Sequence, residues 1–184
     1  IRYRLDGTID VASDYEYEGA AIRKITQRDR FGRILSIAIY EGLAEEELQK
    51  SLTTYGLDGQ VSEITTYFYD AVTKVLDKTV AESVSGVIAT SKFEGARRHE
   101  RVKEVKVQQK DSTGVIRDET LTRYLYKATD ASSNPIPFDL QVLERTETRN
   151  LKATVPGTAT HPLMQVQYFT GARGEEVLDY VKQY

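Results

Sequence analysis

Alternation of apolar and polar residues, the two-residue period of a β-strand, dominates the chain. In the segment Arg101–Gln109, Val105 and Val107 fall on one face, with lysine and glutamate residues opposite. The segment Val61–Tyr69 is rich in β-branched and aromatic residues, a composition typical of strands. The pattern predicts an all-β protein of antiparallel strands with at most one short helix.

Glycine turns recur along the chain with a nearly constant period. The turn sequences are Asp6-Gly7-Thr8-Ile9, Asp29-Arg30-Phe31-Gly32-Arg33-Ile34, Asp58-Gly59-Gln60-Val61, Ser85-Gly86-Val87-Ile88 and Thr113-Gly114-Val115-Ile116. Their glycines are separated by 25, 27, 27 and 28 residues, and Gly171 follows after 57, about two further periods. Glycine adopts positive φ at low cost, as tight hairpin turns require. Each turn therefore predicts a β-hairpin.

Tyrosines mark the same period, because they follow their turn glycines by 8 to 12 residues. They are Tyr15, Tyr17, Tyr40, Tyr67, Tyr69, Tyr124 and Tyr126. The two marks together predict degenerate hairpin repeats of about 27 residues over 1–130, which form an extended or coiled sheet. Tyr-x-Tyr spacing places both rings on one face, where they stack on the neighbouring repeat or on a glycan.

Three segments interrupt the repeat. Leu43–Leu52 has helical propensity but sits where a repeat strand is expected, so both a helix and a hairpin extension remain open. Glu175–Tyr184 is expected to be a strand. All four prolines lie in two loops within 131–162 that flank an expected strand at Asp139–Thr148. We expect residues 131–184 to continue the β array with these proline-containing loops.

Two of these motifs resemble the YD-repeat, or Rhs-type, family of β-hairpin repeats. Tyr67-Phe68-Tyr69-Asp70 is similar to the first half of the family pattern, and Asp29-Arg30-Phe31-Gly32-Arg33-Ile34 to the second, although the halves are not contiguous here. The resemblance covers about residues 1–126. It implies a large bacterial surface or secreted protein whose hairpins coil into an extended sheet or hollow shell. Members of the family wrap toxins, contact cells or bind carbohydrate.

Charge and composition exclude several classes of function. The 25 basic and 28 acidic residues give a formal net charge of −3, against the basic excess that nucleic-acid binding requires. The absence of cysteine excludes disulfides, thiol nucleophiles and zinc–thiolate sites. No apolar run approaches the ~18 residues of a membrane span. The chain opens at Ile1, so we expect it to be part of a longer or processed protein.

The residues that commonly carry chemistry are sparse or better explained by turns. His99 lies in a charged stretch and His161 precedes a proline, without the spacing of metal ligands. Four aspartates near turns have the ligand chemistry of calcium sites but no calcium-loop pattern, so turn capping is preferred. These are Asp6, Asp10, Asp29 and Asp58. We therefore expect no catalytic residue, metal or cofactor.

The sequence as a whole predicts a non-catalytic structural segment of a bacterial surface or secreted protein, which acts as scaffold in a shell, fibre or cell-surface assembly. Its expected partners are neighbouring repeats or identical subunits, joined by strand edges or head to tail. One alternative is a carbohydrate-binding module that uses exposed tyrosines. The others are a hydrolase with a carboxylate pair and a cell-envelope binding domain in which the repeat is coincidental.

Overall fold

The protein is all-β, which confirms the predicted fold class, as a computed structural model shows. The structure describes residues 2–3, 9–130, 132–153, 160–172 and 175–184. The predicted turn at Asp6-Gly7 lies outside the described residues. Two compact units divide the chain, the first made of 1–68 with 79–85 and the second of 69–78 with 86–184. In each unit the strands follow one another in chain order.

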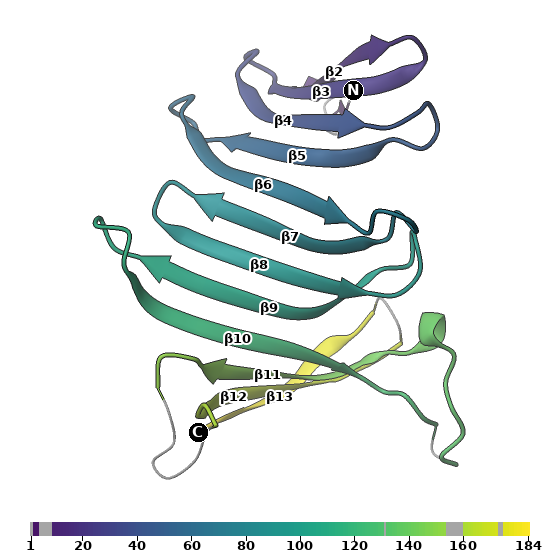
Figure 1. Cartoon of the computed structure of the whole chain (residues 1–184), viewed down its shortest axis with the longest axis vertical. Coiled ribbons are helices and arrows are strands. Elements are labelled where there is room, and N and C mark those ends of the chain that lie inside the picture. Colours follow the sequence, from purple (N-terminus) through teal and green to yellow (C-terminus); the bar gives the residue numbers. More distant parts are fainter. Residues whose placement is uncertain (1, 4–8, 131, 154–159, 173–174) are drawn as a thin grey trace. The chain divides into compact units, whose positions relative to one another are not determined.

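The first unit is an antiparallel meander (Figure 1). Its strands are β1 (Arg2–Tyr3), β2 (Ile9–Glu18), β3 (Ala21–Asp29), β4 (Ile34–Glu41), β5 (Leu48–Tyr55) and β6 (Val61–Tyr69), with the end of β7 (Leu76–Ser83). Register shifts recur near the ends of the paired strands, as between Glu16 and Tyr17 of β2. Such bulges increase the local twist without changing the strand order.

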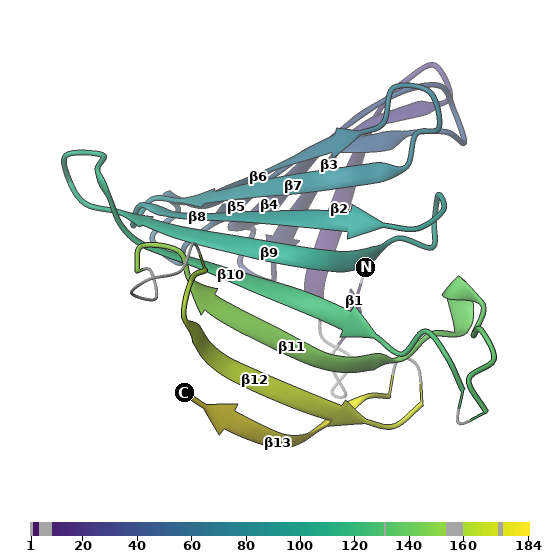
Figure 2. The same ribbon diagram turned by 60° about the horizontal axis from the view of Figure 1, so that its bottom comes forward.

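The second unit is also an antiparallel meander (Figure 2). After the start of β7 its strands are β8 (Val87–Glu94), β9 (Arg101–Lys110), β10 (Ile116–Tyr126), β11 (Leu143–Asn150), β12 (Leu163–Thr170) and β13 (Val177–Gln183). The predicted strand at Asp139–Thr148 is shifted, because a short 3-10 helix, η1 (Phe138–Leu140), occupies its beginning and β11 starts at Leu143. The tail forms the strand that the sequence predicts.

Four hairpin turns share one backbone pattern. The N–H of the first residue donates to the carbonyl of the fifth at 2.8–2.9 Å, and the N–H of the fourth donates to the carbonyl of the first at 2.9–3.1 Å. The first residues are Asp29, Gly56, Asp111 and Asp130. The fourth residue has positive φ in every case, with values from 65° to 82°. This is the geometry of a type I turn with a following bulge, which explains why glycine recurs there.

The prediction that Gly171 continues the series of turn glycines is wrong. Gly86 and Gly114 join an odd-numbered strand to the next even-numbered one, whereas Gly171 joins β12 to β13. In an antiparallel meander these two kinds of connection lie at opposite ends of the strands. The spacing of 57 residues is therefore a coincidence of loop lengths.

Gly171 belongs instead to a second recurring loop. Gly42, Gly95 and Gly171 have φ values of 115°, 125° and 122°, and each follows an aromatic residue by two positions. A glutamate five residues after each glycine accepts a hydrogen bond from a backbone N–H at the start of an earlier strand. The pairs are Glu47 with Ile22 (3.0 Å), Glu100 with Leu76 (3.2 Å) and Glu176 with Leu143 (3.3 Å). The carboxylates thus satisfy strand-end donors.

The helix considered for Leu43–Leu52 is wrong, and the hairpin alternative is correct. Residues 42–47 form the recurring loop, Glu45 has a φ of 69°, and β5 begins at Leu48. Helical propensity is overridden because Glu47 gains a backbone donor from β3 in the hairpin. The hydrogen bond from the N–H of Ile22 is the largest cause of a lowered pKa at Glu47.

The lowered pKa of Glu47 predicts how the substitution Glu47→Gln changes acid sensitivity. A carboxyl with a lowered pKa stabilises the fold above its unfolded value of 4.5, and this stability is lost as pH falls through the folded value. We expect Glu47→Gln to lower the urea midpoint at pH 7 and to reduce the loss between pH 5 and pH 3 relative to the unsubstituted chain. The exposed neighbour Glu46 provides the control. An equal effect from Glu46→Gln would contradict the assignment.

Few side chains are buried in the described part of the chain. The buried apolar residues are Ala21, Ala38 and Val166, and Thr26 and Thr146 are the buried polar ones. No described side chain falls below 2% exposure. Within the described ranges the strands contact only their neighbours in the sheet, so their side chains are covered mainly by others in the same layer.

Candidate functional site

Strand register brings tyrosines from alternate strands of the first unit to one face. Tyr15 of β2 lies opposite Ile25 of β3, Ile25 opposite Ala38, Ala38 opposite Leu52, and Leu52 opposite Thr65. Directly opposed residues share a face, as do residues two apart on one strand. Tyr17, Tyr40 and Tyr67 are two positions from members of this row. We call the face that carries Tyr15, Tyr17, Tyr40 and Tyr67 the tyrosine face.

The four rings differ in exposure. Tyr15 and Tyr17 are 51% and 59% exposed, and their rings stack at a centroid distance of 6.4 Å with an interplanar angle of 23°. Tyr40 and Tyr67 are half-buried, and burial is the largest cause of the raised pKa of each phenol. Tyr15 raises the pKa of Tyr40 further, and Tyr40 and Glu63 raise that of Tyr67.

A groove of about 520 Å³ lies on the tyrosine face. Its apolar lining comes from Ile25, Leu35, Ala38 and Leu52. Its polar lining comes from Gln27, Ser36, Gln49 and Thr54, and Tyr40 and Tyr67 complete it. The described residues that line the groove carry no charge. Mixed apolar and neutral polar lining is typical of small-molecule sites.

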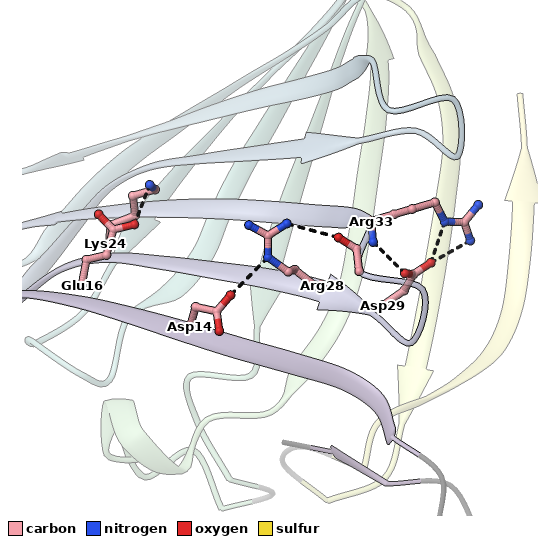
Figure 3. Close-up of polar contacts among 7 residues, drawn as sticks. Asp14, Glu16, Lys24, Arg28, Asp29 and Arg33 are labelled. Atoms are coloured by element: carbon pink, nitrogen blue, oxygen red, sulfur yellow. Dashed lines mark hydrogen bonds and ion pairs between the residues drawn. The ribbon is translucent and has the colours of Figure 1, made fainter.

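Two ion pairs join β2 and β3 on the face opposite Tyr15 (Figure 3). Lys24 of β3 pairs with Glu16 of β2 at 2.7 Å, and Arg28 pairs with Asp14 at 3.1 Å. The members of these pairs are on average about half exposed, so each adds little to stability. These pairs lie away from the groove, whereas Glu63 of β6 shares the tyrosine face, directly opposite the groove residue Thr54.

The tyrosines predicted in the last strand of the repeat region lie in the second unit. Tyr126 is half-buried: its hydroxyl donates to the carbonyl of Val102 at 2.7 Å, and its ring lies 3.8 Å from the Arg101 guanidinium carbon. Burial is the largest cause of its raised pKa. Tyr124, also in β10, is half-buried as well. Tyr69 ends β6 in the second unit, two residues from Tyr67.

No sequence pattern indicated the contacts made by Arg101. Its guanidinium carbon lies 3.9 Å from the Phe138 ring as well, so the cation is held between two aromatic rings. Nε and Nη2 donate to Glu94 at 3.0 and 2.8 Å, and Nη2 donates to Gln141 at 3.0 Å. The charged stretch around His99 thus contains one side chain, Arg101, that holds the 127–142 connection against β9.

A second pair of stacked tyrosine rings was also not predicted from the sequence. Tyr168 of β12 and Tyr180 of β13 are directly opposed in register and stack at 4.4 Å with an interplanar angle of 13°. The pair lies beyond residue 131, where the glycine and tyrosine marks are lost. The only available signal was the alternating pattern of Gln165–Phe169 and Val177–Val181, which does not fix which residues oppose each other.

The acidic residues serve turns and ion pairs. Desolvation raises the pKa of Asp29, but a hydrogen bond from the Arg33 side chain, together with those from the backbone N–H groups of Arg33 and Phe31, outweighs it and lowers the pKa. The pKa values of three further turn aspartates are also lowered, with hydrogen bonds as the largest cause. These are Asp70, Asp111 and Asp130. Asp58 accepts from the N–H of Gln60 at 3.0 Å, while Asp6 lies outside the described residues.

The histidines lie apart in the structure. His99 is exposed in the loop between β8 and β9, and the ring of His161 contacts the carbonyl of Ala153 at 2.8 Å. Within residues 9–130 and the other described ranges, no group of three His, Cys, Asp or Glu side chains could hold a metal ion. In the same ranges no helix is long and apolar enough to cross a membrane.

Comparisons with known proteins add no family. No family model and no curated protein matches the chain. A solved structure of a protein of unknown function from Bacteroides fragilis is 9% identical, covering 98% of this chain and 96% of that one, at a TM-score of 0.16. Because the TM-score is so low, nothing about this chain is inferred from that likeness.

Proposed function

We propose that the chain is a non-catalytic β-repeat scaffold of a larger bacterial surface or secreted protein, and that it joins neighbouring repeats or subunits through its strand edges. The observation that carries the proposal is β13. It pairs with β12 alone among the described strands, and all seven of its residues are exposed. Val177, Leu178 and Val181 give it an apolar composition with high β-propensity.

An edge of this kind is a template for another strand. Its second row of backbone donors and acceptors gains hydrogen bonds when an extended segment is added. The one-layer architecture supports the same role, because a hairpin repeat buries its apolar groups mainly against its neighbours. The resemblance of the Tyr67–Asp70 and Asp29–Ile34 motifs to YD-repeats supports the cell-surface setting.

Two features support a non-catalytic role over a carboxylate hydrolase. A general acid at neutral pH needs a raised carboxyl pKa, and the turn aspartates have lowered values. Glu104 also has a lowered pKa, chiefly through its hydrogen bond from Lys92 across β8 and β9, at 2.8 Å. These acids are held as anions by structural partners.

The scaffold proposal predicts concentration-dependent association through β13. Light scattering coupled to size-exclusion chromatography, with electron microscopy of the largest species, measures it. We expect Val181→Lys to weaken association about tenfold or more, because a charge on an edge strand disfavours strand pairing. Val72→Lys, at an 88% exposed loop position, is the matched control. A single particle size at all concentrations would argue against the proposal.

A further inference from the structure

We propose that the groove on the tyrosine face of the first unit binds a neutral oligosaccharide. This binding site is additional to the scaffold role and rests on the side chains of β2 to β6 alone. The groove has a volume of about 520 Å³. Pockets that bind small molecules commonly measure about 300–1,000 Å³, so the volume suits a short segment of a glycan.

Because the described lining residues carry no charge, they favour a ligand without charge. Gln27, Ser36 and Thr54 offer amide and hydroxyl groups, and no described lining residue carries a charge. Phosphate, sulfate and carboxylate ligands are recognised by Arg, Lys or clustered backbone N–H groups, and cations by carboxylates. Two ion pairs of β2 and β3, Glu16 with Lys24 and Asp14 with Arg28, lie on the other face. Glu63, opposite Thr54, lies on the tyrosine face beside the lining residues, and its negative charge disfavours anionic ligands. A neutral, hydroxyl-rich ligand fits this chemistry.

The aromatic residues of the groove can pack against the apolar face of a sugar ring. A pyranose has one apolar C–H face, which packs on an aromatic ring while the hydroxyls at its rim reach polar groups. Tyr40 and Tyr67 lie in the groove, with Ile25, Ala38 and Leu52 as apolar neighbours. The groove therefore combines both kinds of contact on one sheet face.

Tyr15 and Tyr17 extend the site beyond the groove. Tyr15 lies directly opposite the groove residue Ile25, on the same face as Tyr40. Its stacked pair with Tyr17 is more than half exposed, so two near-parallel rings face solvent beside the groove. A chain of sugars that enters the groove continues over this pair, which favours an oligosaccharide over a single sugar.

The test is binding of the full chain to a glycan array that carries neutral gluco-, xylo-, manno- and chito-oligosaccharides beside sialylated, sulfated and uronic-acid glycans. Isothermal titration calorimetry then measures the Kd of the best neutral oligosaccharide. We expect neutral glycans to bind and the double substitution Tyr15→Ala/Tyr17→Ala to raise the Kd about tenfold or more, through the loss of two stacking surfaces. Ser36→Phe, which fills the groove and leaves all four tyrosines in place, is expected to abolish binding.

The matched control is Tyr180→Ala, because Tyr180 is an exposed member of the other stacked pair and lies in the second unit. We expect it to leave the Kd unchanged, and circular dichroism establishes that each variant is folded. Three results would overturn the proposal: no neutral oligosaccharide binds, charged glycans bind in preference, or neutral binding survives both Tyr15→Ala/Tyr17→Ala and Ser36→Phe.

Discussion

We expect Gly95→Ala to lower the free energy of unfolding by about 4 kcal/mol, the largest effect predicted for a single methyl group in this chain. Gly95 has a φ of 125°, a conformation that L-residues adopt only with strain. A Cβ atom there would lie 2.7 Å from the carbonyl oxygen of His99 and 2.8 Å from the Phe138 ring. Backbone strain of ~2 kcal/mol and overpacking of ~2 kcal/mol account for the estimate. Urea unfolding followed by circular dichroism measures it.

Gly114→Ala is the matched control, because Gly114 also has positive φ, at 82°, but a Cβ there meets no atom within 4 Å. We expect it to cost about 1–2 kcal/mol, the backbone penalty alone. The difference between the two variants isolates the close approach of the loop and the Phe138 ring. Equal losses would show that Phe138 does not pack on Gly95 as described.

The second large effect is expected for Arg101→Ala, about 3 kcal/mol of unfolding free energy, because the substitution removes two cation–ring contacts and leaves Glu94 and Gln141 without their donor. The Arg101 side chain is only 14% exposed, so its contacts are little screened by water. Its loss also releases Phe138 and with it the connection between β10 and β11. The urea midpoint measures the loss of stability, and proteolysis within 127–142 reports the release of the connection.

Two variants separate charge from shape at this position. Arg101→Lys keeps the charge but not the planar fork, so we expect it to recover less than half of the lost stability. Arg117→Ala removes a 65% exposed arginine paired with Asp111, and we expect a loss of about 0–1 kcal/mol. If Arg101→Ala lowered the free energy of unfolding no more than Arg117→Ala, the contacts of Arg101 with the Tyr126 and Phe138 rings would contribute nothing measurable to stability.

Alternation and β-propensity predicted several of the strands, and the spacing of glycines predicted four of the turns between them. The turns at Gly32, Gly59, Gly86 and Gly114 were found because a positive φ favours glycine regardless of what surrounds the turn. The strand assigned to the tail, β13, followed from the same reasoning. Local conformational preference is a property of short segments, so it can be read from the sequence directly.

The prediction failed where a segment's structure depends on a distant partner. Leu43–Leu52 has the propensity of a helix, but Glu47 caps the N–H of Ile22 in β3. Gly171 has the spacing of a turn glycine, but the lengths of the intervening connections place it at the other end of its strands. Neither the partner of a carboxylate nor the length of a connection is encoded in local periodicity.

The sequence by itself determined the fold class, the hairpin turns and the set of tyrosines from which the tyrosine face is drawn. Only the tertiary structure decided which tyrosines share a surface, because strand register fixes the neighbours of each side chain across the sheet. Register places Tyr15, Tyr40 and Tyr67 together along an uncharged groove, while Tyr126 packs on Arg101. These neighbours come from separate strands, and their proximity arises only when the strands pair.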